Sequence, residues 1–255
     1  MAAVLADGTT TVFNAACEPH VQDLCAMLNK MGARIEGIGT NYLRIHGVAS
    51  LGGTRHRVPA DYIDTASFMA AAAVTGGRLE VKDASADQLA VVARPFRKLG
   101  ITWQTQEREL RVPANLTLKM ANDYGAAIPK VEDGPWPAFP SDLMSVAIVA
   151  ATQASGTMLF FEKMFESRMY FVDRLIDMGA RIVQCDPHRV IISGPAPLHG
   201  TRVSSPDIRA GMALIIAALC AKGETVIHNA ESIDRGYEHI DQELRRLGAD
   251  IVRLP

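Results

Sequence analysis

The residues best suited to chemistry in this chain are aspartates that stand at the start of long apolar segments. They are Asp61, Asp64, Asp142 and Asp207, at the starts of the segments 64–75, 141–154 and 207–221. At the amino end of a helix, a carboxylate caps free backbone N–H groups and complements the helix dipole, which is worth about 0.5 to 2 kcal/mol. Such helix ends, with Arg209 beside one of them, could also bind an anion. Capping and ligand binding are therefore both open for each aspartate.

The three apolar segments have the composition of helices that are buried on every side. They are rich in alanine and apolar nearly all round, without the polar stripe of a surface helix. The longest nearly uncharged stretch, 210–221, is shorter than the roughly 20 residues that a membrane-spanning helix needs. We therefore expect these segments to form the inside of a globular fold.

A glycine-terminated unit recurs four times along the chain. Its glycines are Gly32, Gly100, Gly179 and Gly248. They are separated by 68, 79 and 69 residues, which indicates a repeated α/β module. Each comes after an amphipathic stretch and precedes a short apolar segment, as expected where a helix ends at glycine and leads into a strand. The strand that opens each module is expected after Gly8, Gly77, Gly156 and Gly223.

The stretches before these glycines are predicted to be helices that cover a sheet from the solvent side. In the segment 19–31, apolar residues recur with helical spacing behind a proline. The segments 170–178 and 237–247 repeat the pattern, whereas Pro95 should kink or shorten the second copy. With the buried helices, this pattern places helices inside and sheets outside. Short strands are expected at 42–45 and 190–192.

The composition is that of a globular protein and argues against several classes of function. A net charge of −2, from 26 basic and 28 acidic residues, offers no patch for nucleic acid or an anionic membrane. The four cysteines form no C-x-x-C pair and no leader is visible, which favours a reducing cytoplasm. The histidines lack metal-site spacing, and Gly37-Ile38-Gly39 is better explained as a hairpin turn than as a dinucleotide motif. We therefore expect no metal and no cofactor.

Four short strings occur in a fixed order along the second half of the chain. They are Pro137-Ala138-Phe139-Pro140-Ser141-Asp142, Phe165-Glu166-Ser167-Arg168, Ser205-Pro206-Asp207-Ile208-Arg209-Ala210 and Ile233-Asp234-Arg235-Gly236-Tyr237-Glu238. With these strings on its repeated background, essentially the whole chain resembles the enolpyruvyl transferases. The resemblance is strongest to the members that act on UDP-N-acetylglucosamine. It implies an inside-out α/β barrel of repeated βαβαββ modules, with sheets outside and buried helices inside.

The resemblance also implies an activity, the transfer of the enolpyruvyl group of phosphoenolpyruvate to a sugar hydroxyl. In the family this passes through a tetrahedral intermediate that expels phosphate. Such chemistry needs a base, an acid, and cations for a carboxylate and a phosphate. The implied small-molecule partners are phosphoenolpyruvate and UDP-N-acetylglucosamine. Transfer to another acceptor, such as shikimate 3-phosphate, and a non-catalytic nucleotide-sugar-binding paralogue both stay open.

Three residues match the family's catalytic positions. Asp142 matches the carboxylate that contacts the attacking hydroxyl and serves as its base. Arg209 and Arg245 match arginines that grip phosphoenolpyruvate, a task suited to the planar, bidentate guanidinium. Arg245 stands beside Arg246 on what we expect to be an exposed helix, so a surface role stays open for it. Asp207 would orient Arg209 or neighbouring groups.

Further residues match the family's substrate-binding positions. Met164 and Phe165 match the place where backbone and aromatic ring meet the nucleotide sugar, and Arg168 belongs to the same loop. An aromatic residue at this spacing could equally lie in the core. Asp61 matches a position near the cleft between the family's two domains. For the string 234–237, we favour a turn with a local ion pair over a direct catalytic role.

The number of modules predicts how the chain divides. The family builds two domains from three modules each, with the site between them, and this chain holds about three and a half. Residues 1–57 are expected to be the tail of the first domain, and 58–255 most of the second. The family's Lys-Asn pair and reactive cysteine fall outside the match, and Cys17 should be structural. The expected macromolecular partner is the remaining N-terminal half or a second copy of the chain.

The second module is longer than the others, and its extra residues lie in the segment 113–136. Glycine and proline in this segment predict a loop that leads directly to Asp142. Such a loop could alter the choice of acceptor or be a solvated surface insertion.

Overall fold

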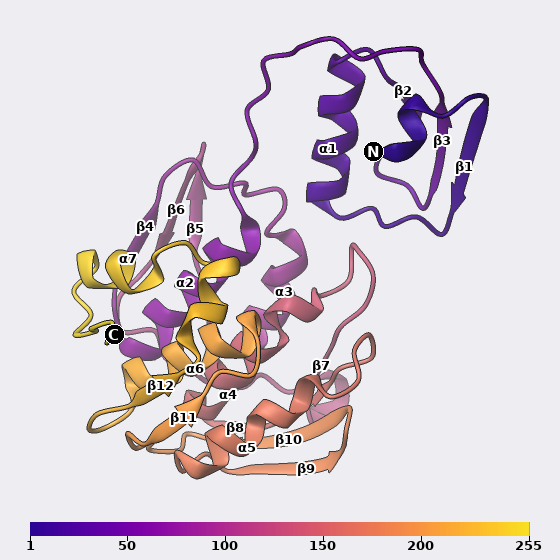
Figure 1. The fold of residues 1–255 in the computed structure, drawn as a ribbon. Helices are drawn as coiled ribbons and strands as arrows, with labels where there is room; N and C mark the ends of the chain where they lie inside the picture. The colour runs from indigo at the N-terminus through magenta and orange to yellow at the C-terminus, as the bar shows by residue number, and fades with distance from the viewer. Residues whose placement is uncertain (255) are drawn as a thin grey trace. The chain divides into compact units, whose positions relative to one another are not determined.

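The structure is a computed structural model that describes residues 1–254. It contains two compact units, drawn in Figure 1. The first unit comprises Met1–Ala60 and Pro135–Ala138, and the second comprises the rest of the chain.

The first unit places one amphipathic helix on a three-stranded antiparallel sheet. Its elements are η1 (Ala2–Leu5), β1 (Thr9–Phe13), α1 (Pro19–Lys30), β2 (Arg34–Glu36) and β3 (Tyr42–His46). The helix begins at Pro19 and buries Cys25 and Leu28 in one core with apolar residues of β2 and β3. Gly37 and Gly39 both have positive φ in the turn that joins these strands, which confirms the hairpin.

The second unit holds the remaining elements. In chain order they are α2 (Tyr62–Thr75), β4 (Leu79–Val81), α3 (Ala90–Lys98), β5 (Gln104–Gln106), β6 (Glu109–Val112), η2 (Tyr124–Ala126), β7 (Lys130–Glu132), η3 (Ser141–Leu143), α4 (Met144–Gln153), β8 (Gly156–Phe161), η4 (Arg168–Phe171), α5 (Val172–Asp177), β9 (Ile182–Asp186), β10 (Arg189–Gly194), β11 (Arg202–Ser204), α6 (Ile208–Cys220), β12 (Val226–His228), η5 (Ala230–Arg235) and α7 (Ile240–Arg246). The expected helices are present, with ends that differ by a few residues, and the expected strands at 42–45 and 190–192 are β3 and β10.

The sheets repeat one strand order, which confirms the repeated module. In β1-β3-β2, β4-β6-β5 and β8-β10-β9, the middle strand pairs antiparallel with both neighbours. Two further pairs, β7 with β8 and β11 with β12, are parallel and enclose α4 and α6. A parallel pair needs such a crossover, so these are β-α-β units. From β7 to β10, the strands and α-helices keep the strand-helix-strand-helix-strand-strand order.

The three alanine-rich helices form the interior of the second unit. Helices α2, α4 and α6 pack against one another, and α4 also packs against β8 and β10 (Figure 1). Every residue from Val146 to Ala151 in α4 is completely buried, as the absence of a polar stripe predicts. Within residues 1–254 the four sheets remain separate, and they do not join into a closed barrel. The described chain is therefore a mixed α/β fold with buried helices.

The four glycine stops are confirmed, but only three of them lead toward a strand. Gly32, Gly100, Gly179 and Gly248 all have positive φ, between 84° and 103°, the left-handed region that ends a helix without steric cost in glycine. After Gly248, however, the residues up to 254 are not in a strand.

One other expectation needs correction, and another is confirmed. The segment 113–136 is not loop throughout, because it contains β7, whose Val131 is buried where the strand pairs with β8. Helix α3 contains Pro95 in its nine residues, with Val92 and Phe96 on either side of the proline fully buried. It is shorter than α1, as the proline predicts.

Candidate active site

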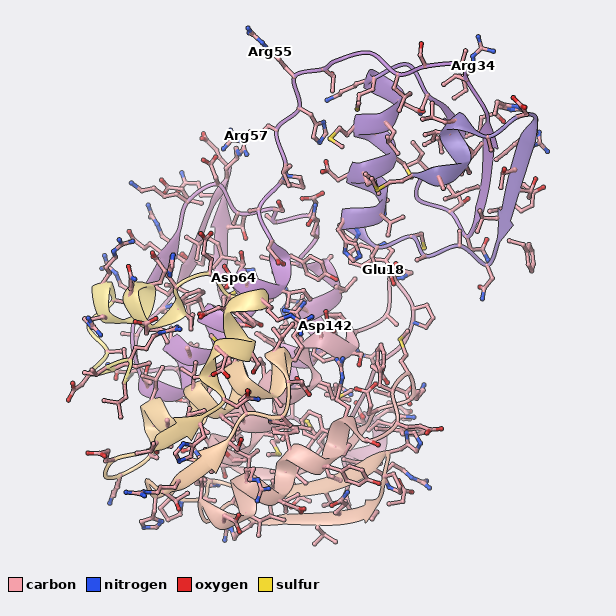
Figure 2. All side chains as sticks on the ribbon, in the orientation of Figure 1. Glu18, Arg34, Arg55, Arg57, Asp64 and Asp142 are labelled. Atoms are coloured by element: carbon pink, nitrogen blue, oxygen red, sulfur yellow. The ribbon has the colours of Figure 1, made fainter. Side chains whose placement is uncertain are left out.

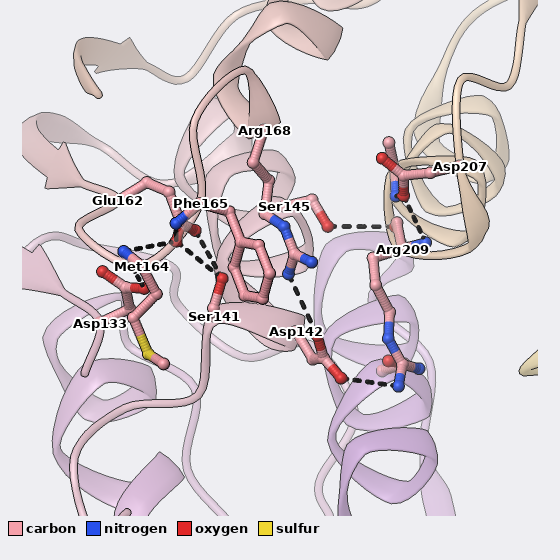
Figure 3. Close-up of polar contacts among 12 residues, drawn as sticks. Asp133, Ser141, Asp142, Ser145, Glu162, Met164, Phe165, Arg168, Asp207 and Arg209 are labelled. Atoms are coloured by element: carbon pink, nitrogen blue, oxygen red, sulfur yellow. Dashed lines mark hydrogen bonds and ion pairs between the residues drawn. The ribbon is translucent and has the colours of Figure 1, made fainter. Parts of the chain in front are cut away.

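Asp142 differs from the other helix-start aspartates because its carboxylate bonds to arginine side chains and caps no helix in the part of the chain that the structure describes. It lies in η3, directly before the buried helix α4. Its Oδ1 accepts a hydrogen bond from Arg168 Nη1 at 3.1 Å, and its Oδ2 accepts one from Arg209 Nη2 at 2.7 Å (Figure 3). Within residues 1–254, neither η3 nor α4 has a side-chain cap. The carboxylate therefore serves the two arginines and not the helix end.

Two of the other aspartates are helix caps. Asp61 Oδ1 accepts from the backbone N of Ile63 at 2.8 Å, at the start of α2. Asp207 Oδ1 accepts from the backbone N of Arg209 at 2.7 Å and of Ala210 at 2.8 Å, at the start of α6. Asp207 thus orders the backbone that carries Arg209 and does not bond the guanidinium. Of the two roles considered for these residues, capping is the one observed.

Arg209 contacts Asp142, an aromatic ring and the neighbouring helix α4. It projects from the first turn of α6, and its guanidinium lies 5.6 Å from the centre of the Tyr237 ring. Tyr237 is 2% exposed, and its hydroxyl lies 2.9 Å from Ser67 Oγ of α2. In addition, Ser145 Oγ of α4 donates to the backbone carbonyl of Arg209 at 3.0 Å. These contacts fix the position of the guanidinium beside Asp142.

Arg168 approaches Asp142 from the loop after β8. Its guanidinium lies 4.4 Å from the centre of the Phe165 ring, a cation–π geometry. Phe165 is 47% exposed and the neighbouring Met164 is 44% exposed. Phe165 is therefore not a core residue, and the alternative of core packing is wrong for it. The loop presents apolar surface and a cation together, which suits a ligand with a flat ring and negative charge.

The charges around Asp142 keep it ionised. Burial acts to raise the pKa of Asp142, but the charge of Arg209 and the hydrogen bonds from both arginines outweigh it and hold the pKa below its ordinary value.

The pKa of Asp64, in the first turn of α2, is shifted in the opposite direction. Burial and the nearby Asp61 raise the pKa of Asp64 to about 6, against the opposing charge of Arg209. Figure 2 labels both aspartates at the amino ends of buried helices. One cluster thus contains an ionised carboxylate and one that titrates near neutral pH.

A second carboxylate supports the loop that carries Phe165 and Arg168. Glu162, at the end of β8, is fully buried and accepts hydrogen bonds from Ser141 Oγ at 2.7 and 2.8 Å. Its Oε1 also accepts from the backbone N of Met164 and of Phe165, each at 3.2 Å. Figure 3 shows this carboxylate between the loop and the turn that contains Asp142.

Arg245 is not part of this cluster. It lies in α7, and its guanidinium donates to the backbone carbonyl of Ile251 at 2.8 and 3.0 Å. It lines a shallow surface pocket together with Asp241 and Arg253. Nearby, Asp234 is bonded by Arg253 at 2.6 and 2.8 Å, so the ion pair expected within the string 234–237 is instead made with a residue near the end of the chain.

Sequence reasoning misses three residues around the cluster. It predicts a turn at Gly236 and gives Tyr237 no contact with Arg209, a contact that the structure shows, and it does not single out Glu162 or Asp133. No local pattern distinguishes these residues, because their partners lie far away in the sequence. The one sequence feature that could have drawn attention to Glu162 is its place directly after the apolar strand β8.

Residues 1–254 contain neither a metal-binding cluster nor a membrane span. No group of three or more His, Cys, Asp or Glu side chains among them is placed to hold a metal ion. No helix in this part of the chain is long and apolar enough to cross a membrane.

Comparison with known proteins places the chain in a family. A sequence model of the EPSP synthase (3-phosphoshikimate 1-carboxyvinyltransferase) family matches residues 1–251. The chain belongs to this family. Within the EPSP synthase family, it is 54% identical to the UDP-N-acetylglucosamine 1-carboxyvinyltransferase of Treponema denticola, over 98% of this chain. It is 55% identical to the enzyme of the same name from Bradyrhizobium diazoefficiens, over 100% of this chain. The chain spans 59% of the length of each of these relatives.

Solved structures agree with the membership in the EPSP synthase family. The enolpyruvyl transferase NikO from Streptomyces tendae superimposes with a TM-score of 0.83 at 25% identity, over 97% of this chain and 57% of that one. EPSP synthase from Acinetobacter baumannii gives a TM-score of 0.71 at 21% identity, over 99% of this chain and 60% of that one, a likeness of fold alone.

Proposed function

We propose that this chain transfers the enolpyruvyl group of phosphoenolpyruvate to the 3-hydroxyl of UDP-N-acetylglucosamine, with release of phosphate. This reaction begins peptidoglycan precursor synthesis. The observation that carries the proposal is Asp142, a carboxylate that caps no helix among the described residues and is bonded by two arginines. The identity of 54–55% to two UDP-N-acetylglucosamine 1-carboxyvinyltransferases supports the choice of acceptor.

In this proposal, Asp142 is the base and the arginines bind the donor. Asp142 takes the proton of the acceptor hydroxyl while the hydroxyl oxygen of the acceptor bonds to C2 of phosphoenolpyruvate. An acid protonates C3 in the same step. The C2–O bond to phosphate then breaks and C3 loses a proton, which restores the double bond. Arg168 and Arg209 neutralise the donor carboxylate and phosphate, because a guanidinium fork pairs bidentately with either group.

The two arginines that are proposed to bind the donor also pair with Asp142, so donor binding and the basicity of Asp142 are linked. Both arginines donate to Asp142, so an incoming anion competes with this carboxylate for them. When the arginines turn to the anion, the main cause that lowers the pKa of Asp142 is weakened, and the carboxylate becomes a stronger base. Donor binding would therefore prepare the base for the acceptor.

Other residues of the site receive supporting roles. We propose that Met164 and Phe165 contact the nucleotide sugar, because both are exposed beside Arg168. Asp61 and Asp207 keep their helix ends ordered, as their capping contacts suggest. Arg245, bonded to the Ile251 carbonyl, receives no role in this mechanism.

The proposal extends to the domains and to a partner. We propose that residues 1–57 form the tail of one family domain and 58–255 most of the other. The complete second domain would close as an inside-out barrel around α2, α4 and α6. The chain spans 59% of its relatives' length, so the macromolecular partner would be the remaining half of the fold or a second copy of this chain.

Calorimetry with two acceptors tests the proposed substrate. UDP-N-acetylglucosamine should bind the chain, and shikimate 3-phosphate should produce no heat of binding under the same conditions. The reverse order would overturn the choice of acceptor. Phosphate release from phosphoenolpyruvate in the same mixtures then separates an enzyme from a binding protein. Release that depends on UDP-N-acetylglucosamine supports the proposal, whereas binding without release supports the non-catalytic alternative.

A further inference from the structure

Glu162 is a fully buried carboxyl group, 0% exposed, so none of its atoms is in contact with solvent. Burying such a group is costly unless hydrogen bonds replace its water. Here the replacements come from two segments of the candidate site. Ser141 donates from the turn that contains Asp142, and the backbone N–H groups of Met164 and Phe165 donate from the loop. Glu162 therefore joins the two segments that bear the site.

A second buried carboxyl group acts on the same loop. Asp133, which comes directly after β7 and is 2% exposed, accepts hydrogen bonds from the backbone N of Lys163 and, at 3.3 Å, of Met164. Three consecutive backbone N–H groups, from Lys163 to Phe165, thus point at two carboxyl groups. Few other conformations of the loop would give these three buried N–H groups hydrogen-bond acceptors, so the two carboxyl groups restrict the loop to this one.

The surroundings raise the pKa of Glu162 toward neutral pH. Burial, a hydrogen bond with Asp133 and the charge of Asp133 raise the pKa of Glu162 to about 7, against the opposing effects of Ser141 and Arg168. The His188 ring faces the backbone carbonyl of Glu162 at 2.8 Å. The Lys163 ammonium is directed to the surface, where it pairs with Glu132 at 3.3 Å. Loss of the Glu162 proton would therefore leave a buried carboxylate beside Asp133, which burial and the charge of Asp133 both oppose.

We propose that Glu162 is a positioning residue whose carboxyl group fixes the loop 163–168, with Phe165 and Arg168, against the Ser141–Asp142 turn. Its effect on substrate rests on the proposed function, whereas its effect on the loop does not. Because the loop depends on one proton, its order decreases as pH rises above neutral. Arg168 then holds Asp142 less firmly, and the apolar surface of Phe165 loses its fixed place.

Amide hydrogen exchange of Met164 and Phe165 tests the positioning directly, without any substrate. Expressed as protection factors, protection in the wild type should fall about four-fold between pH 6.5 and pH 8.5, since a carboxyl group with a pKa of about 7 stabilises the closed loop by a factor that decreases with its bound proton. Glu162→Gln keeps a neutral group that can accept from both amides and donate to Asp133, so its protection should change less than about two-fold over this range. Equal pH dependence in the two proteins, or none in the wild type, would overturn the proposal.

A matched variant and a ligand measurement complete the test. Glu132→Gln removes a surface charge that pairs with Lys163 but touches none of the three amides, so it should behave as the wild type in hydrogen exchange. The dissociation constant of UDP-N-acetylglucosamine should rise by up to the same factor, about four-fold, from pH 6.5 to 8.5 in the wild type and stay level in Glu162→Gln. A wild type that fails to bind the sugar nucleotide contradicts the proposed function, while the exchange data still decide the role of Glu162. Binding that stays level with pH while the amides lose protection would refute the link from loop to site.

Discussion

Substitution of Asp142 by asparagine should make the chain bind phosphoenolpyruvate more tightly. In the wild type, a donor anion must displace Asp142 from Arg168 and Arg209, which bond it at 3.1 and 2.7 Å. A charge-assisted hydrogen bond contributes about 1.5 to 3 kcal/mol net when buried. The side chains of Asp142, Arg168 and Arg209 are 38%, 17% and 21% exposed, so solvent screening lowers this to about 1 kcal/mol for each bond.

Asparagine keeps one oxygen that can accept from an arginine but carries no charge, so the competing interaction should weaken by about 1 to 2 kcal/mol, or roughly a 5- to 30-fold lower dissociation constant. Calorimetric titration of phosphoenolpyruvate at low and moderate salt measures it, and the gain should shrink as salt screens the charges. Asp177→Asn is the matched control, since this exposed aspartate pairs with Arg174 on the surface at 3.6 Å. Its affinity for the donor should equal that of the wild type. Unchanged or weaker donor binding by Asp142→Asn would refute the competition between Asp142 and the anion.

Three further predictions concern stability. Tyr237→Phe removes the buried hydroxyl contact with Ser67 and should cost about 1 kcal/mol, lowering the melting temperature by about 2–4 °C; an unchanged melting curve would count against this contact. Gly211→Ala in α6 should cost about 1–3 kcal/mol despite the better helix propensity of alanine, because its Cβ would overlap Ser205 and the Ile233 side chain; a stabilised variant in urea unfolding would contradict the packing. The raised pKa of Glu162 should make the free energy of unfolding fall by about 3 kcal/mol as pH rises from 4.5 to 7, and Glu162→Gln should flatten that part of the urea-derived stability profile; equal slopes would disprove the assignment.

The repeated module could be predicted from the sequence because its determinants are local. A glycine with positive φ ends each helix, and helical spacing of apolar residues precedes it, so both appear within a dozen residues of sequence. The buried helices were equally visible, since α4 and α6 lack a polar face. The strands β7 and β11 were harder to predict because each has only three residues and forms by pairing with a strand beyond the next helix.

The site was predicted only in part because its contacts are not local. An aspartate at a helix start caps the helix or binds a ligand, and the sequence offers the same pattern for both. The distinction depends on Arg168 and Arg209, which lie 26 and 67 residues from Asp142. Likewise, the supports given by Tyr237 and Glu162 appear only when distant segments are brought together. The charged residues of the site can therefore be identified from the sequence, whereas their hydrogen-bond partners become known only from the folded structure.

The most direct test of the account is phosphate release from phosphoenolpyruvate in the presence of UDP-N-acetylglucosamine. The account predicts release by the wild type and by Asp177→Asn, and release that is about 10² to 10⁴-fold slower for Asp142→Asn, the usual contribution of a placed base. Equal rates for the wild type and Asp142→Asn would contradict the role of Asp142 as the base that serves the acceptor hydroxyl.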